Sequence, residues 1–326
     1  MTGTAHVTAS RAAPVPAPAA GQDATAWHPP PAVAPRGTLL VLPGRGEHPG
    51  VYERFGRRLA ADGYVVHALE LPPDAGTAEV RAAIRSAAGD EPAAPLVLVG
   101  ADTGALQALH TAESLSPAAP GPPLAGVVAA APAPVDTSVP AAAPASGPDT
   151  EAGGTGGAEA PRKGGADTAW ESELDARTVC PVHRARLTAD ASFERGALSG
   201  PVPDRLRGRA YTALPVLVLH GAADPVTPLA QARDLAARLP LATLGVLREG
   251  RHDVLNDASH RSAAAALVLW LERLRGGPLS PPVLTLEAAP AESTGPADTA
   301  APPTSPISPA GPAAPTGPGG PREGIA

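Results

Sequence analysis

An aspartate follows a predicted buried strand at a position suited to chemistry. Residues 95–101 (PLVLVGA) predict the strand, and the chain then reads G-A-D-T-G, in which Gly100 and Gly104 flank Asp102. Glycines two residues before and after a side chain allow a strand-to-helix turn that is too tight for larger residues. Such a turn lifts Asp102 above the sheet edge, where its carboxylate can meet a substrate.

Two further predicted strands lead to a carboxylate and an imidazole. Strand 215–221 runs into Asp224, and strand 242–248 is followed by His252. Ligands of open α/β sheets bind outside the carboxyl ends of the strands. We therefore expect these two side chains to meet Asp102 at that edge, although they are far apart in the sequence.

The elements that would position these residues alternate along the chain. Short apolar runs alternate with segments of helical periodicity, which predicts an α/β fold with a doubly wound, mostly parallel sheet. The predicted strands are 38–43, 65–71, 95–101, 124–131, 215–221 and 242–248. The predicted helices are 51–61, 77–88, 103–114, 228–238 and 257–275. The β-prone stretches 6–8 and 25–27 would add an antiparallel edge.

Composition divides the chain into a core, a cap and three segments without a core. The 43 prolines and 35 glycines gather with alanine in stretches that cannot bury enough surface to offset chain entropy. We expect one core of ordinary enzyme size from 25–132 and 213–276, with a small helical cap at 168–212. We expect a flexible N-terminus at 1–24, a disordered insertion at 133–167 and a disordered tail at 277–326.

Charge and cysteine content exclude several classes of function. The formal net charge is −7 and the arginines are scattered, which argues against a nucleic-acid or anionic-membrane surface. The chain has no signal-like start and no apolar stretch of roughly 20 residues, so a cytoplasmic protein without an integral membrane segment is expected. Cys180 is the single cysteine, which leaves no internal disulfide and no usual zinc spacing. We expect no metal and no cofactor, and the sequence gives no prediction of oligomeric state.

Over roughly residues 25 to 275 the chain resembles the α/β-hydrolases of the monoacylglycerol lipase, lysophospholipase and serine-aminopeptidase-like group. The resemblance is carried by LPGRGEH at 42–48, Tyr52, the turn around Asp102, HGAADPVTP at 220–228 and GRHDVLND at 250–257. It implies an α/β-hydrolase fold with a shortened cap.

The resemblance also assigns roles to individual residues. Asp102 stands at the nucleophile position, followed in the family's order by the acid Asp224 and the general base His252. The backbone N–H groups of Arg45 and Thr103 are the implied oxyanion-hole donors.

Two residues depart from the group's pattern: Pro43 replaces a histidine and Asp102 replaces serine. A carboxylate is ionised at neutral pH without help from a base. The α/β-hydrolases that use aspartate, such as haloalkane dehalogenases and epoxide hydrolases, attack an sp³ carbon, and their histidine activates the water that hydrolyses the enzyme ester. Attack on an ester carbonyl would instead expel the carboxylate more readily than the alkoxide.

We therefore expect a hydrolase of a small organic substrate with an Asp-His-Asp triad, the ester, epoxide or carbon–halogen bond being unresolved. The halide-binding tryptophan of dehalogenases is replaced by Thr103, and the cap has no tyrosine before Tyr211. Trp170, Tyr211 or Tyr52 could substitute. The alternative is a catalytically silent small-molecule-binding homologue, in which an Asp102–His252 ion pair favours the imidazolium and removes the base.

Several polar residues are expected to be structural. Glu47 and His48 would satisfy backbone groups in their turn, and His220 would be a buried structural histidine. The acidic run Glu171, Glu173 and Asp175 is predicted to be a solvated helix face.

Overall fold

The structure is a computed structural model that describes residues 24–114, 123–135 and 165–285. The stretch 6–8, most of the expected N-terminus and insertion, and the tail beyond residue 285 lie outside the described residues.

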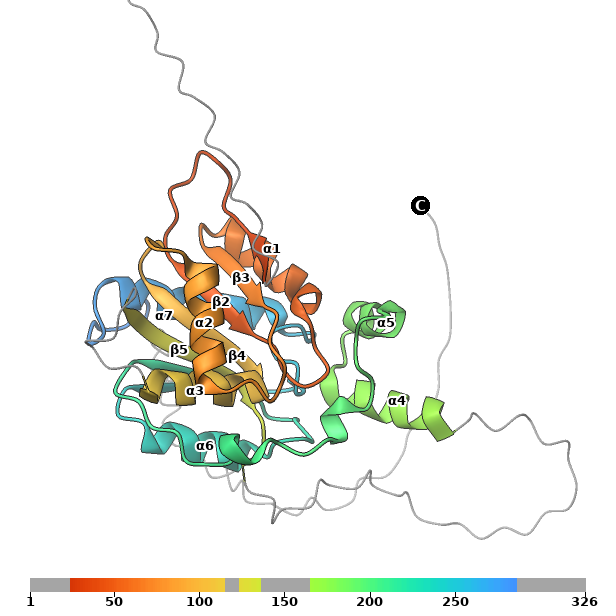
Figure 1. The fold of residues 1–326 in the computed structure, drawn as a ribbon. Helices are drawn as coiled ribbons and strands as arrows, with labels where there is room; N and C mark the ends of the chain where they lie inside the picture. Colours follow the sequence, from red (N-terminus) through yellow and green to blue (C-terminus); the bar gives the residue numbers. More distant parts are fainter. Residues whose placement is uncertain (1–23, 115–122, 136–164, 286–326) are drawn as a thin grey trace, which may run out of the picture. The chain divides into compact units, whose positions relative to one another are not determined.

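Seven strands form one sheet in the order β1-β3-β2-β4-β5-β6-β7 (Figure 1). Strands β2 to β7 pair in parallel, and β1 pairs antiparallel with β3 at the edge. The strands are β1 Ala24–Trp27, β2 Thr38–Leu42, β3 Val65–Leu69, β4 Leu96–Asp102, β5 Leu124–Pro132, β6 Val216–Gly221 and β7 Ala242–Leu247. The predicted doubly wound, mostly parallel sheet is confirmed, and β4 lies at its centre.

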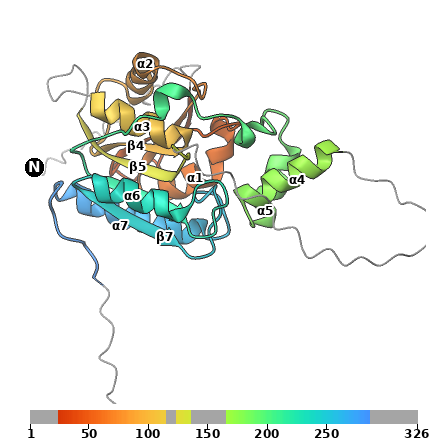
Figure 2. The same cartoon turned by 90° about the horizontal axis from the view of Figure 1, so that it is seen from below.

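Helices cover both faces of the sheet (Figure 2). The helices of the core are α1 Glu53–Ala61, α2 Thr77–Ala88, α3 Thr103–Ser114, α6 Leu229–Arg238 and α7 His260–Arg275. The segment expected as one helix at 51–61 is divided, because a 3₁₀ turn, η1, occupies Pro49–Tyr52 before α1. Apolar side chains of α1 and α7 join one core cluster, and those of α2, α3 and α6 join the other.

Alternation along the strands explains why the sheet is buried on both faces. In β2, Leu39 and Val41 belong to one cluster, whereas Leu40 and Leu42 belong to the other. Successive side chains of a strand point to opposite faces, so a continuous apolar run supplies both layers. Both faces of the sheet are apolar, so the polar side chains that could react lie at the ends of the strands.

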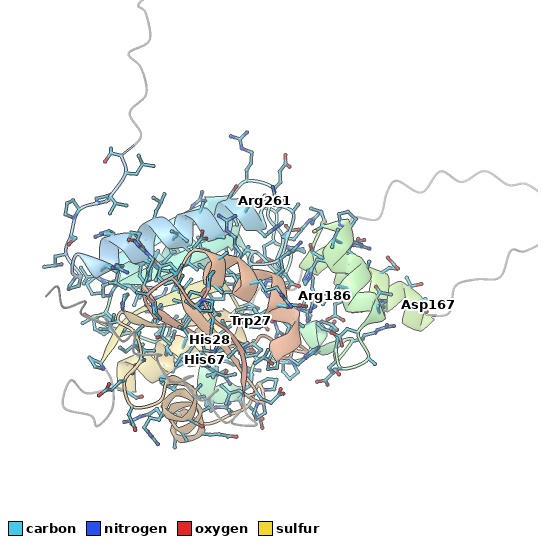
Figure 3. The ribbon with its side chains drawn as sticks, turned by 90° about the horizontal axis from the view of Figure 1, so that it is seen from above. Trp27, His28, His67, Asp167, Arg186 and Arg261 are labelled. Carbon is cyan, nitrogen blue, oxygen red and sulfur yellow. The ribbon has the colours of Figure 1, made fainter. Side chains whose placement is uncertain are left out.

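A cap lies between β5 and β6. It contains α4 Gly165–Arg177, α5 Pro181–Ala189, and the 3₁₀ turns η2 Ala197–Ser199 and η3 Asp204–Leu206. Helix α4 begins inside the range expected as insertion, and Trp170 of this helix is buried and packs against Phe193. Arg186 of α5 points from the cap toward the core (Figure 3), where it donates to the carbonyl of Gly50 at 2.7 Å and to Glu53 at 2.8 Å.

Candidate functional site

The turn from β4 into α3 places Asp102 in a left-handed backbone conformation. Its φ is +49°, which is rare for a residue with a side chain. A Cβ at Gly100 would lie 2.1 Å from the carbonyl oxygen of Gly104, and one at Gly104 would lie 2.1 Å from the carbonyl oxygen of Leu42. Both glycines are therefore required by close backbone approach, as the sequence pattern indicated.

The structure brings the three predicted site residues together. His252 Nδ1 lies 2.8 Å from Asp224 Oδ2, and His252 Nε2 lies 3.2 Å from Asp102 Oδ1. The other oxygen of Asp224 accepts the backbone N–H groups of Val226 and Thr227 at 2.8 and 3.2 Å. All three side chains of the constellation are buried. Asp224 is thus fixed by its own turn and orients the imidazole toward Asp102.

The side chain of Arg45 fills the space in front of Asp102. Its Nε donates to Asp102 Oδ2 and its Nη2 donates to Oδ1, each at 2.8 Å. Its Nη1 donates to the carbonyls of Leu198 and Gly200 in the cap, at 3.0 and 2.6 Å. Arg45 is 5% exposed and Asp102 is 3% exposed, so this is a two-pronged ion pair removed from water.

The hydrogen bonds to Asp102 occupy its whole carboxylate. Oδ1 accepts from Arg45 Nη2 and lies beside His252 Nε2, whereas Oδ2 accepts from Arg45 Nε and from the Arg45 backbone N–H at 2.9 Å. An ionised carboxylate offers about four lone-pair sites. With an imidazolium at position 252, each of those sites has a donor.

The two expected oxyanion-hole donors differ in their hydrogen bonding. The Arg45 N–H is engaged by Asp102 itself. The backbone N–H of Thr103 makes no hydrogen bond to a residue that the structure describes, and the buried Oγ1 of Thr103 also has no partner there. One of the two implied donors is thus free and the other is occupied.

Burial and charge set the ionisation of the cluster. Burial alone would lower the pKa of His252, but the carboxylates of Asp224 and Asp102 outweigh it and raise that pKa to about 10. Burial would raise the pKa of Asp102, yet the hydrogen bonds and charge of Arg45, with a smaller contribution from His252, hold it well below the usual range. At neutral pH the site is an imidazolium and a guanidinium facing Asp102 and Asp224.

This ionisation predicts a loss of stability in mild alkali. The pKa of His252 is above the value of about 6.5 for an unfolded histidine. Its contribution to the free energy of unfolding is therefore complete below pH 6.5 and is lost as the pH rises through 10. Urea unfolding at a series of pH values is expected to show this fall in the native protein.

The fall should be reduced in His252→Gln and unchanged in a control, His28→Gln, at an exposed position. An imidazole signal of His252 that titrates near its ordinary pKa in NMR spectra would contradict the assignment.

A second buried arginine, Arg177 at the end of α4, joins the cap to this site. Its Nη2 donates to the carbonyl of Arg45 at 2.7 Å, its Nε and Nη2 to Glu173 at 3.0 Å, and its Nη1 to Asp253 at 3.3 Å. The last two carbonyls of α4 accept the backbone N–H groups of His252 and Asp253. The cap thus holds the turns that carry Arg45 and His252.

The structure corrects one expectation about the acidic run. Glu173 is not on a solvated face: it is 6% exposed, because it faces inward on α4 and pairs with Arg177. Glu171 and Asp175 are exposed and pair with Arg184, which agrees with the solvated face expected for them.

The histidines and the glutamate expected to be structural make local bonds. Glu47 accepts the Gly44 N–H at 2.8 Å, and His48 Nδ1 accepts the Gly50 N–H at 3.2 Å. His220 is buried and lies 2.9 Å from the carbonyl of Thr227.

The aromatic residues considered as substrate ligands are placed apart from one another. Tyr52 lines the small cavity beside Asp102, but its hydroxyl donates to Glu47. Trp170 packs against Phe193 in the cap, and Tyr211 is half exposed and does not line that cavity.

Little open space remains beside Asp102 and His252. The cavity bounded by Tyr52, Asp102 and His252 has a volume of about 10 Å³, which is room for about one water molecule. Within the described residues, no group of three or more His, Cys, Asp or Glu side chains is arranged to hold a metal ion.

Comparison with known proteins agrees with this architecture. A sequence model of the alpha/beta hydrolase family matches residues 39–268. The chain belongs to the α/β-hydrolase family. A search of curated proteins found no match.

Solved structures similar to this α/β-hydrolase include two lipases. The monoacylglycerol lipase of Paleococcus ferrophilus is 21% identical, with 76% of this chain and 97% of the lipase covered and a TM-score of 0.52. A soluble variant of the monoglyceride lipase of Saccharomyces cerevisiae, in complex with a substrate analogue, is 14% identical, with 77% and 91% covered and a TM-score of 0.52. At these identities the likeness establishes the shared fold. Across the described residues of this α/β-hydrolase, each helix is too short or too polar to cross a membrane.

Sequence reasoning assigned Arg45 a backbone role and missed its side chain. A signal was present in the sequence. An arginine in the turn at 42–48 can pair with an acidic residue in the turn from β4 into α3 once both are buried. Which way that side chain turns depends on the cap carbonyls that hold its Nη1, and these lie more than 150 residues along the chain.

Proposed function

We propose that this α/β-hydrolase is a catalytically silent homologue that binds a small molecule and does not hydrolyse through its triad positions. The observation that carries the proposal is the buried ion pair between Arg45 and both carboxylate oxygens of Asp102.

A nucleophilic carboxylate needs a lone pair directed at the substrate carbon. The lone pairs of Asp102 are directed instead at the Arg45 guanidinium, the Arg45 N–H and His252. Removing one partner of a buried ion pair costs about 3–5 kcal/mol. A substrate would have to supply that free energy before the carboxylate could attack.

The state of His252 also supports silence. A histidine that activates water must be neutral, and the pKa of His252 is raised to about 10 by Asp224 and Asp102 against the effect of burial. At neutral pH this side chain is a protonated ion-pair partner and cannot accept a proton from water.

The second candidate is a hydrolase in which Asp102 is the covalent nucleophile and His252 the base. It is favoured by the position of Asp102 at the strained elbow, with Oδ2 on the N–H of the implied oxyanion turn and Oδ1 beside His252. Ester formation would remove the Asp102 charge and with it part of the cause that raises the His252 pKa. This candidate requires Arg45 to leave the carboxylate.

Isotope transfer separates the two candidates. The protein is mixed, in excess over substrate, with small esters, epoxides and haloalkanes in heavy-oxygen water, and its peptides are analysed by mass spectrometry. We expect no product above the uncatalysed rate and no heavy oxygen in the peptide that contains Asp102. A haloalkane dehalogenase with an aspartate nucleophile serves as the positive control. Product together with label at Asp102 would overturn the silent assignment and establish the second candidate.

A further inference from the structure

A cavity of about 120 Å³ lies apart from the triad, where the start of α2 meets α3 and η3. The cavity beside Asp102 has about 10 Å³. At roughly 10–15 Å³ for each water, the larger cavity holds several waters or one compact polyatomic ion. Its polar lining residues are Thr77, Gln107, His110, Thr111 and Arg205.

Arg205 brings a positive charge to the rim of this cavity. Its Nη2 donates to the carbonyls of Ala75 at 2.7 Å and Pro73 at 3.3 Å, which fixes the guanidinium beside the chain that leads into α2. Its Nε and Nη1 make no hydrogen bond to a residue that the structure describes. Arg205 therefore has donors left over for a ligand.

His110 adds a second nitrogen without a partner. Its Nε2 is buried and has no hydrogen-bond partner among the residues that the structure describes, whereas its Nδ1 lies 3.5 Å from Glu113. A buried polar atom without a partner is costly in a folded protein. With Nδ1 toward the Glu113 carboxylate, Nε2 of a neutral imidazole is an acceptor, and the O–H of a protonated phosphate in the cavity would satisfy it.

The first turn of α2 also favours an anion in this cavity. Gly76 precedes the helix and offers no side-chain cap, so the first backbone N–H groups lack the usual partner. Thr77 of this turn lines the cavity. The N-terminal end of a helix carries a partial positive charge and favours anions.

Among the described residues, no carboxylate lines this cavity. Glu113 is directed at His110 Nδ1, Asp204 pairs with Arg207 at 3.1 Å, and Glu79 in the first turn of α2 is exposed. The lining residues carry donors and one fixed positive charge, with Gln107 already donating to the carbonyls of Pro72 and Pro73. The positive charge of Arg205 and the first turn of α2 favour an anion in this cavity.

We propose that this cavity binds a phosphate-type oxyanion, either free phosphate or the phosphate group of a small monoester, with Arg205 and His110 as its main ligands. The proposal deepens the small-molecule-binding function by naming a ligand class and a site, and it rests on that function. It does not depend on the triad, so its failure would leave the isotope test of silence unaffected.

Calorimetric titration of the full chain with inorganic phosphate at constant ionic strength tests the proposal. We expect saturable binding that is weakened at least about tenfold in Arg205→Gln, because the variant loses a charge-assisted hydrogen bond to the anion. His110→Gln should weaken binding as well. The matched control is Arg207→Gln, which removes a neighbouring arginine that is already paired with Asp204.

A second arm uses glycerol phosphate in place of inorganic phosphate, and a third uses chloride. Tighter binding of the monoester would assign the site to a phosphate carried by a larger molecule, and equal binding would assign it to the phosphate group alone. Absence of saturable phosphate binding would overturn the proposal. So would binding that survives Arg205→Gln unchanged, or binding that chloride matches.

Discussion

Replacing Arg45 with methionine is expected to lower the free energy of unfolding by about 3–5 kcal/mol, the cost of leaving a buried charge without its partner. Methionine keeps a similar chain length but removes the guanidinium that holds both oxygens of Asp102. Asp102→Asn should cost a similar amount, because it leaves the buried Arg45 guanidinium without its counter-charge. Asparagine keeps the shape of the side chain and tolerates the positive φ at this position. Urea unfolding measures both changes.

The double variant identifies the ion pair as the cause. Arg45→Met with Asp102→Asn removes both charges, so its loss of stability should be smaller than the sum of the two single losses. The matched control is the solvent-facing pair formed by Arg58 of α1 and Asp62, the residue that follows this helix. The same two substitutions there should change stability by less than about 1 kcal/mol. Additive losses at Arg45 and Asp102 would show that the two side chains are not coupled.

The second large effect is a gain of esterase activity in the double variant Arg45→Ala with Asp102→Ser. Serine removes the carboxylate that poorly suits ester cleavage, and alanine empties the space of the guanidinium. The backbone N–H of residue 45 is then free to join that of Thr103 as an oxyanion donor. Loss of the Asp102 charge also removes one cause of the raised pKa of His252, which favours its neutral form.

Hydrolysis of a short p-nitrophenyl ester measures this gain. The rate of the double variant should exceed that of the same variant with His252→Ala by about 10²–10⁴-fold, the usual contribution of a general base. Asp102→Ser alone should stay inactive, because it leaves the Arg45 guanidinium buried in the site. A double variant that folds and remains inactive would mean that the turn does not form a working oxyanion site.

The strand and helix pattern was predictable because each core element carries its own period. β4 and β6 were expected within one or two residues of their observed ends, since a continuous apolar run can satisfy two buried faces only as a central strand. The start of α1 was less predictable, because Pro49 and Gly50 support a 3₁₀ turn before the helix begins.

The tight turn around Asp102 could also be predicted from nearby residues. Gly100 and Gly104 are needed wherever a strand turns directly into a helix, and the atoms that exclude a Cβ belong mostly to the turn itself and to the neighbouring strand. The meeting of Asp102 with Asp224 and His252 followed from one topological rule about the edge of a parallel sheet.

The α/β layers, the tight turn and the residue types gathered at the sheet edge could be predicted from the sequence, because these depend on periodicity and local sterics. The turn of the Arg45 side chain onto Asp102 depends on contacts between distant parts of the chain, since the carbonyls that hold its guanidinium come from the cap. The same holds for Glu173, whose burial depends on Arg177. The partner of a charged side chain depends on the distance between the charges and on their desolvation in the folded protein. Neither quantity can be derived from spacing along the sequence.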